Sequence, residues 1–174
     1  MMNKKKIFIA VDTNKISRAK RIIKDTQTNK IKIGYKFGLE FFYSKEGRKF
    51  ISRLKNQTIF LDLKLNDIPN TVVSAIKSLK SLKISYLTVH LSSGLSALKA
   101  LKKESRNIKI VGVTTLTSLN NKDLKEIGYN KKVNELVRHQ AKLATKAKLD
   151  AIVCSGHEIK SVKRVFKKEI ITPG

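Results

Sequence analysis

The stretch from Thr58 to Thr71 reads TIFLDLKLNDIPNT, and it indicates how the whole chain is built. It opens with an apolar, β-branched run that is typical of a buried strand. A segment with helical spacing of its apolar residues follows from 71 to 82. The same order of short apolar run and helical segment recurs along the chain, and this alternation predicts a parallel sheet covered by helices.

Seven apolar runs are predicted as strands, at 7–12, 31–37, 58–64, 86–90, 108–114, 151–154 and 169–172. Helices are expected at 17–23, 47–55, 71–82, 95–102 and 133–148. A (β/α)8 barrel needs eight strands and typically about 250 residues, whereas the 174 residues here stop just after the seventh run. We therefore predict one domain over residues 1–174, an α/β barrel of the (β/α)8 type with about seven strands, its last strand and helices missing.

The composition excludes several classes of protein. A single cysteine, Cys154, excludes a disulfide scaffold and a cysteine-based zinc cluster. The apolar run at 7–11 is too short for a signal peptide, and no stretch reaches the roughly 18 apolar residues of a membrane span. We therefore expect a cytoplasmic protein that has no contact with a membrane.

The net charge of +25 raises the possibility of a nucleic-acid partner. However, 31 of the 38 basic residues are Lys and only 7 are Arg. Proteins that bind bases or phosphates through bidentate hydrogen bonds favour Arg. The lysines are also scattered as doublets and triplets. A solvated lysine surface is therefore the favoured interpretation, and a basic nucleic-acid-binding module stays as the alternative.

Charged residues gather at the predicted strand ends. Asp12 ends the first strand and Lys36 the second, Asp62 and Lys64 end the third, and Asp67 follows on the next loop. Catalytic groups of α/β barrels collect at the carboxyl ends of the strands. A strand buried on both faces cannot leave charges unpaired, so these five residues predict a polar site at one rim. A surface ion pair on an edge strand is the alternative.

Successive side chains of a regular strand point to opposite sides of the sheet, and this predicts on which side the residues of the third strand lie. Asp62 and Lys64 are two residues apart, so they are expected on one side of the third strand. The leucines at 61, 63 and 65 are expected on the other side.

The segment from Asp62 to Thr71, DLKLNDIPNT, resembles the active-site motif of bacterial orotidine 5′-phosphate decarboxylases. Asp12 resembles the first-strand Asp of that family, and the Lys36 segment its second-strand Lys. Later strand ends match in the same order, at 89–94, 113–118, 153–155 and 172–174.

The resemblance implies decarboxylation of orotidine 5′-monophosphate to UMP, the last step of de novo pyrimidine synthesis, with no metal or organic cofactor. The carbanion left at C6 cannot be delocalised onto a cofactor, so it needs a preorganised cation. Lys64 would stabilise the carbanion and donate the proton. Asp62 and Asp67 would be the other catalytic residues, keeping Lys64 protonated and in place.

The resemblance further implies a homodimer in which Asp67 and Thr71 reach the partner's site. Asp12 and Lys36 would hold the ribose hydroxyls. Thr117 and Ser118 fall where the family contacts the pyrimidine ring, with Thr117 favoured.

Several alternatives stay open. Lys32 competes with Lys36 as the second-strand lysine, and Thr117 could merely cap its loop. A metal-dependent sugar-phosphate enzyme of the same barrel superfamily competes with the decarboxylase. In the family, the main phosphate-gripping Arg lies beyond the position of Gly174, so we expect this chain alone to bind the nucleotide weakly and to turn over slowly or not at all. It would then be an inactive fragment.

Overall fold

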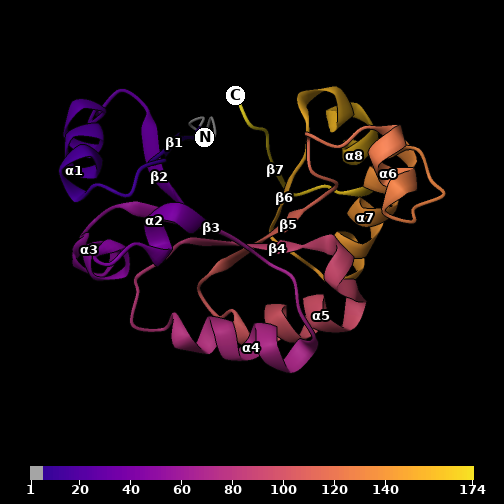
Figure 1. The fold of residues 1–174 in the computed structure, drawn as a ribbon, viewed down its shortest axis with the longest axis horizontal. Coiled ribbons are helices and arrows are strands. Elements are labelled where there is room, and N and C mark those ends of the chain that lie inside the picture. Colours follow the sequence, from indigo (N-terminus) through magenta and orange to yellow (C-terminus); the bar gives the residue numbers. More distant parts are fainter. Residues whose placement is uncertain (1–5) are drawn as a thin grey trace. The chain divides into compact units, whose positions relative to one another are not determined.

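The computed structural model describes residues 6–174 as strands that alternate with helices (Figure 1). Seven strands form one sheet in the order of the sequence. They are β1 (Lys6–Ala10), β2 (Lys32–Gly38), β3 (Thr58–Leu65), β4 (Tyr86–His90), β5 (Lys109–Val113), β6 (Ala151–Val153) and β7 (Glu169–Ile171). Pairing is parallel between β1, β2 and β3 and again between β5, β6 and β7. The predicted parallel α/β fold is confirmed, and each strand boundary lies within two residues of its expected place.

Within residues 6–174, eight helices connect the strands. They are α1 (Ile16–Asp25), α2 (Leu39–Tyr43), α3 (Gly47–Arg53), α4 (Pro69–Ser78), α5 (Gly94–Glu104), α6 (Asn121–Glu126), α7 (Val133–Lys146) and α8 (Ile159–Val165), with 3-10 turns η1 (Leu91–Ser93) and η2 (Gly156–Glu158). All five predicted helical segments are confirmed, although α4 ends at Ser78, four residues before its expected end. The helices α2, α6 and α8, of five to seven residues, were not predicted from the sequence. None of the helices between residues 6 and 174 is long and apolar enough to cross a membrane.

The chain packs as two compact units, which are described in turn. Among the described residues, the first contains 6–63 together with 79–87, and the second contains 64–78 together with 88–174. That the whole chain forms a single domain stays a prediction.

Aromatic side chains from three strands fill part of the first unit. The rings of Phe8, Phe60 and Tyr86 lie with centroids 5.0–5.6 Å apart. Lys6 Nζ donates a hydrogen bond of 2.8 Å to the buried Tyr86 hydroxyl and lies 4.8 Å from its ring centroid. Gly34 is required beside this cluster, because a Cβ there would lie 2.7 Å from Phe8 Cδ1.

Helices pack in pairs in the second unit. The helices α4 and α5 lie side by side, and α7 packs against α8 (Figure 1). The buried residues Val72 and Ile76 on α4, and Leu98 and Leu101 on α5, follow the three- and four-residue spacing of an apolar helix face. Burial of such faces is the main favourable term for folding this unit.

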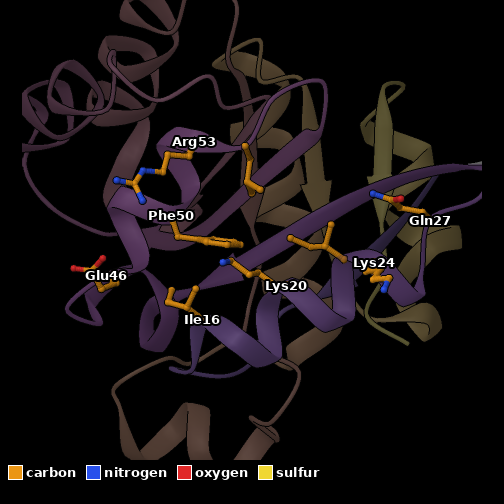
Figure 2. Close-up of a pocket in the computed structure, with 9 residues that line it drawn as sticks. Ile16, Lys20, Lys24, Gln27, Glu46, Phe50 and Arg53 are labelled. Carbon is orange, nitrogen blue, oxygen red and sulfur yellow. The ribbon is translucent and has the colours of Figure 1, made fainter.

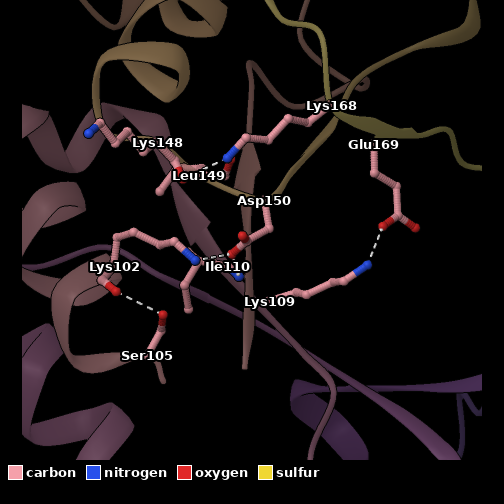
Figure 3. A network of polar contacts seen from close by, with 9 residues as sticks. All are labelled: Lys102, Ser105, Lys109, Ile110, Lys148, Leu149, Asp150, Lys168 and Glu169. Carbon is pink, nitrogen blue, oxygen red and sulfur yellow. Dashed lines mark hydrogen bonds and ion pairs between the residues drawn. The ribbon is translucent and has the colours of Figure 1, made fainter. Parts of the chain in front are cut away.

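A polar network ties the amino-terminal ends of β5, β6 and β7 together (Figure 3). Asp150 precedes β6, and its Oδ2 accepts hydrogen bonds from Lys102 Nζ at 2.6 Å and from the backbone N–H of Ile110 at 2.8 Å. Lys109 on β5 forms an ion pair of 3.1 Å with Glu169 on β7. Asp150 thus joins α5 and β5 to the start of β6 through one carboxylate.

Replacing Asp150 should destabilise the protein because it would leave the Ile110 N–H and the Lys102 ammonium without this acceptor. We expect Asp150→Ala to lower the free energy of unfolding by about 2 kcal/mol, the scale of a lost charged hydrogen bond. Glu126→Gln is the matched control, because Glu126 forms only an exposed 3.9 Å pair with Lys122, and exposed pairs contribute less than about 1 kcal/mol. Urea unfolding measures both variants, and equal losses would contradict the role given to Asp150.

Candidate active site

The register of the first three strands places their carboxyl-terminal halves side by side. Ala10 of β1 is opposite Lys36 of β2, and Gly38 of β2 is opposite Asp62 of β3. The backbone N–H of Val11 continues the ladder by donating to Lys36 O at 2.9 Å. Because of this register, three of the predicted site residues meet in the first unit.

Lys36 lies between two carboxylates. Its Nζ is 3.4 Å from Asp62 Oδ2 and 3.7 Å from Asp12 Oδ1. The Asp62 side chain is only 14% exposed, whereas that of Asp12 is 68% exposed. The Lys36–Asp62 pair is therefore the less screened of the two. Its gross Coulomb attraction is about 5 kcal/mol at an effective dielectric constant of 20, and desolvation of both groups opposes it.

The two candidate lysines of β2 lie at opposite ends of that strand. Lys32 begins β2, is exposed and is opposite Lys6 of β1. Lys36 lies near the carboxyl end, where it meets Asp12 and Asp62. The structure therefore places Lys36, and not Lys32, among the predicted acidic residues.

Lys64 has an unusual backbone for a residue in a strand. Its φ is +48°, in the left-handed region that residues other than glycine rarely adopt. Such a conformation costs about 1–3 kcal/mol and persists only where the surroundings hold it. The backbone N–H of Lys64 donates to Thr88 Oγ1 at 2.8 Å, and Thr88 on β4 is fully buried.

This conformation interrupts the regular alternation expected along β3. Leu61 and Leu63 are buried as predicted, but Leu65 is only half-buried. The alternation that put residues 62 and 64 on one side assumes extended geometry at every residue. A left-handed residue at 64 does not meet that assumption, so the alternation does not continue through the end of the strand.

The turn after β3 is fastened to the turn after β4. Asn66 Oδ1 accepts a hydrogen bond from Ser93 Oγ at 2.9 Å and a longer one of 3.5 Å from Ser92 Oγ. Asp67 Oδ1 accepts from the N–H of Ile68 at 2.7 Å, just before α4 begins at Pro69. Asp67 and Thr71 are both exposed.

Thr117 and Ser118 lie at the centre of a turn after β5. The N–H of Leu119 donates to Leu116 O at 3.0 Å and closes this turn, and both predicted residues are exposed. Gln140 on α7 supports the start of the loop, because its Oε1 accepts from the N–H and the hydroxyl of Thr115 at 2.8 and 3.2 Å.

Sequence reasoning missed the contributions of Gln140 and Thr88. Gln140 was visible only as one more residue in the helical pattern of α7. A polar residue between the apolar Leu87 and Val89 of β4 was the available signal for Thr88.

The end of β6 carries a buried thiol and a buried acid. Burial, together with the negative charge of Glu158, raises the pKa of Cys154 to about 11. The thiol therefore stays protonated at neutral pH, which fits a packing residue better than a nucleophile. Burial also raises the pKa of Glu158, although the N–H of Ser155 and the charge of His157 oppose this shift. Glu158 accepts that N–H at 3.0 Å and caps η2.

A cavity of about 420 Å³ lies in the first unit and is lined mainly by residues of α1 and α3 (Figure 2). Apolar side chains from α1 and α3 form part of its lining, and charged residues surround them. The lining residues are Ile16, Lys20, Ile23, Lys24, Gln27, Glu46, Phe50, Arg53 and Leu54. None of the predicted site residues lines it. Among the described residues, no group of three or more His, Cys, Asp or Glu side chains is placed to hold a metal ion.

Comparison with known proteins relates this site to one family. Residues 5–174 match the family model described as "Orotidine 5'-phosphate decarboxylase / HUMPS family". The orotidine 5′-phosphate decarboxylase of Erythrobacter litoralis is 37% identical over 175 residues, which cover 97% of this chain and 75% of the relative. The corresponding protein of Carboxydothermus hydrogenoformans is 35% identical over 96% of this chain and 72% of the relative.

Solved structures show the same fold. The crystal structure of orotidine 5′-phosphate decarboxylase from Lactobacillus acidophilus matches with a TM-score of 0.88 and 30% sequence identity, over 97% of this chain and 80% of that one. The decarboxylase from Methanocaldococcus jannaschii, crystallised with the inhibitor BMP, matches with a TM-score of 0.81 at 24% identity, over 98% of this chain and 78% of that one. This likeness confirms the predicted barrel type of fold.

Proposed function

The chain belongs to the orotidine 5′-phosphate decarboxylase / HUMPS family, and we propose that it converts orotidine 5′-monophosphate to UMP in pyrimidine biosynthesis, using the end of β3. The observation that carries this proposal is the segment 62–71, in which Asp62, Lys64 and Asp67 follow a buried apolar strand and lead into α4. The relatives described above are named orotidine 5′-phosphate decarboxylase.

The reaction requires a cation at the carbon that loses CO2. The bond between C6 and the carboxylate breaks, CO2 leaves, and the electron pair stays on C6. The pyrimidine ring cannot delocalise that pair onto a cofactor, so a preorganised ammonium is the most effective stabiliser. Lys64 supplies it and then donates its proton to C6 as a general acid, and solvent returns the proton to Lys64.

The acids on either side of Lys64 in the sequence complete the proposed catalytic group. Asp62 is two residues before Lys64 and Asp67 three residues after it. A carboxylate attracts a neighbouring ammonium and helps to hold it in place. Asp62 is also held by Lys36 at 3.4 Å and is mostly shielded from water, so its charge is fixed before substrate arrives.

Residues on the other strand ends bind the rest of the nucleotide. Asp12 and Lys36 hold the ribose hydroxyls, and their separation of 3.7 Å supports a shared hydrogen-bonding role. Thr117 contacts the pyrimidine ring, with Ser118 beside it in the same exposed turn.

We propose that the enzyme works as a cytoplasmic homodimer. Asp67 and Thr71 then serve the partner's site, and their exposure in the single chain supports this. Ile68, next to Asp67, is a large apolar residue that is 66% exposed, as expected for a surface that a second subunit covers. The lone free cysteine agrees with a reducing compartment.

Removal of the Lys64 ammonium should abolish the chemistry. We expect Lys64→Ala to lower the single-turnover rate of CO2 release from orotidine 5′-monophosphate by about 1,000-fold or more, the scale of losing a preorganised charge. Lys122→Ala, on the exposed surface of α6, is the matched control and should keep the wild-type rate. If the wild-type chain releases no CO2 above background, the proposal of decarboxylation by this chain fails and the alternative of an inactive fragment is supported. If Lys64→Ala keeps the wild-type rate, the role of Lys64 fails.

A mixing experiment tests the shared site. Lys64→Ala and Asp67→Asn should each be nearly inactive alone. After mixing and subunit exchange, half of the dimers are mixed, and one of the two sites in each has both native residues. About one quarter of the wild-type activity should therefore return, and a mixture as inactive as its parents would contradict the supply of Asp67 by the partner.

Substitutions of Lys36 and Lys32 form a matched pair that tests substrate binding. Lys36→Met removes a charged contact near the ribose and should raise KM by about 10-fold or more, as expected for one charged hydrogen bond. Lys32→Met, at the other end of β2, should leave KM within about two-fold of the wild-type value. Steady-state kinetics distinguish the two variants. The reverse pattern would identify Lys32 as the counterpart of the family's second-strand lysine.

A further inference from the structure

The backbone at Lys64 needs an external support. With φ at +48°, this residue departs from the extended conformation of the strand that it terminates. A residue in such a conformation returns to a commoner one when the contacts that hold it are lost. The direction of a side chain depends on its own backbone angles, so a change here would also move the lysine side chain.

The Thr88 hydroxyl provides that support. It lies 2.8 Å from the Lys64 nitrogen and accepts its N–H. Thr88 is fully buried in β4, between the buried residues Leu87 and Val89, so both its position and its rotamer are fixed by packing. The hydrogen bond itself is part-buried, so water competes with it less than with an exposed one.

A second contact fastens the chain just beyond Lys64. Ser93 Oγ, from the turn after β4, lies 2.9 Å from Asn66 Oδ1. This second contact is exposed, unlike the first. The Thr88 hydroxyl is therefore the stronger of the two constraints on residues 64–66.

We propose that Thr88 is a positioning residue for decarboxylation: its buried hydroxyl holds the backbone of Lys64 in the left-handed conformation from which the ammonium acts. This inference rests on the proposed function, because it assigns the purpose of the contact to Lys64 chemistry. Thr88 touches neither substrate nor reacting atoms in this account. Its loss would displace the ammonium, and a misplacement of about 1 Å can cost about 100-fold in rate.

Two substitutions at position 88 separate positioning from stability. Thr88→Val keeps the branched shape and removes the hydroxyl, and we expect kcat to fall by about 10- to 100-fold with little change in KM. Thr88→Ser keeps the hydroxyl and loses the methyl group, so it should keep kcat within about three-fold while lowering the melting temperature. The proposal is overturned if kcat follows the melting temperature instead of the hydroxyl.

Thr114→Val is the matched control. Thr114 is also buried at a strand end, and its hydroxyl donates to the Val153 carbonyl at 3.0 Å instead of contacting residues 64–66. It should lose stability without the fall in kcat, and an equal fall would show that losing any buried hydroxyl slows the enzyme. Amide hydrogen exchange gives a readout independent of activity, because the Lys64 amide should exchange faster in Thr88→Val alone.

The outcomes distinguish this inference from the function on which it rests. If the wild-type chain decarboxylates, Lys64→Ala does not, and Thr88→Val keeps the wild-type kcat, then the positioning role fails and the function stands. If the wild-type chain does not decarboxylate, both fail.

Discussion

A strand of a parallel sheet covered by helices can hold a charged side chain only where that charge is paired or reaches water, and this constraint governs the carboxyl-terminal halves of the first three strands. Leu61 and Leu63 are buried within β3, and the charges begin among and after them. Asp62 is accommodated because Lys36 from the neighbouring strand lies 3.4 Å away. The parallel register contributes to this approach, because it places Asp62 opposite Gly38, two residues after Lys36 on β2.

Preorganisation follows from the same arrangement. Lys36 is already paired with two carboxylates, and the turn after β3 is already fastened to the turn after β4. An enzyme that stabilises a carbanion by charge alone needs such fixed groups, because reorganisation during the reaction would cancel the benefit. The left-handed backbone of Lys64 fits this picture, since strained conformations concentrate at functional sites.

The features that depend on local pattern were predictable from the sequence. The seven apolar runs indicated the strands, and the charges at 12, 36 and 62 indicated which strand ends meet. The helix α2 was not predictable, because its five residues are too few to show a helical period. The contacts from Thr88 to Lys64 and from Gln140 to Thr115 span 24 and 25 residues. Such hydrogen bonds have no local signature, and neither does a left-handed lysine, because turn-forming Gly or Asn is the usual sign of that conformation.

The central claim is that Lys64 stabilises a carbanion at C6 and transfers the proton there. By microscopic reversibility, the same group should remove the C6 proton of the product. The most direct measurement is therefore proton NMR of UMP incubated with the protein in D2O. We predict that the wild-type chain exchanges the C6 proton for deuterium and that Lys64→Ala does not. Exchange by Lys64→Ala at the wild-type rate would contradict the account.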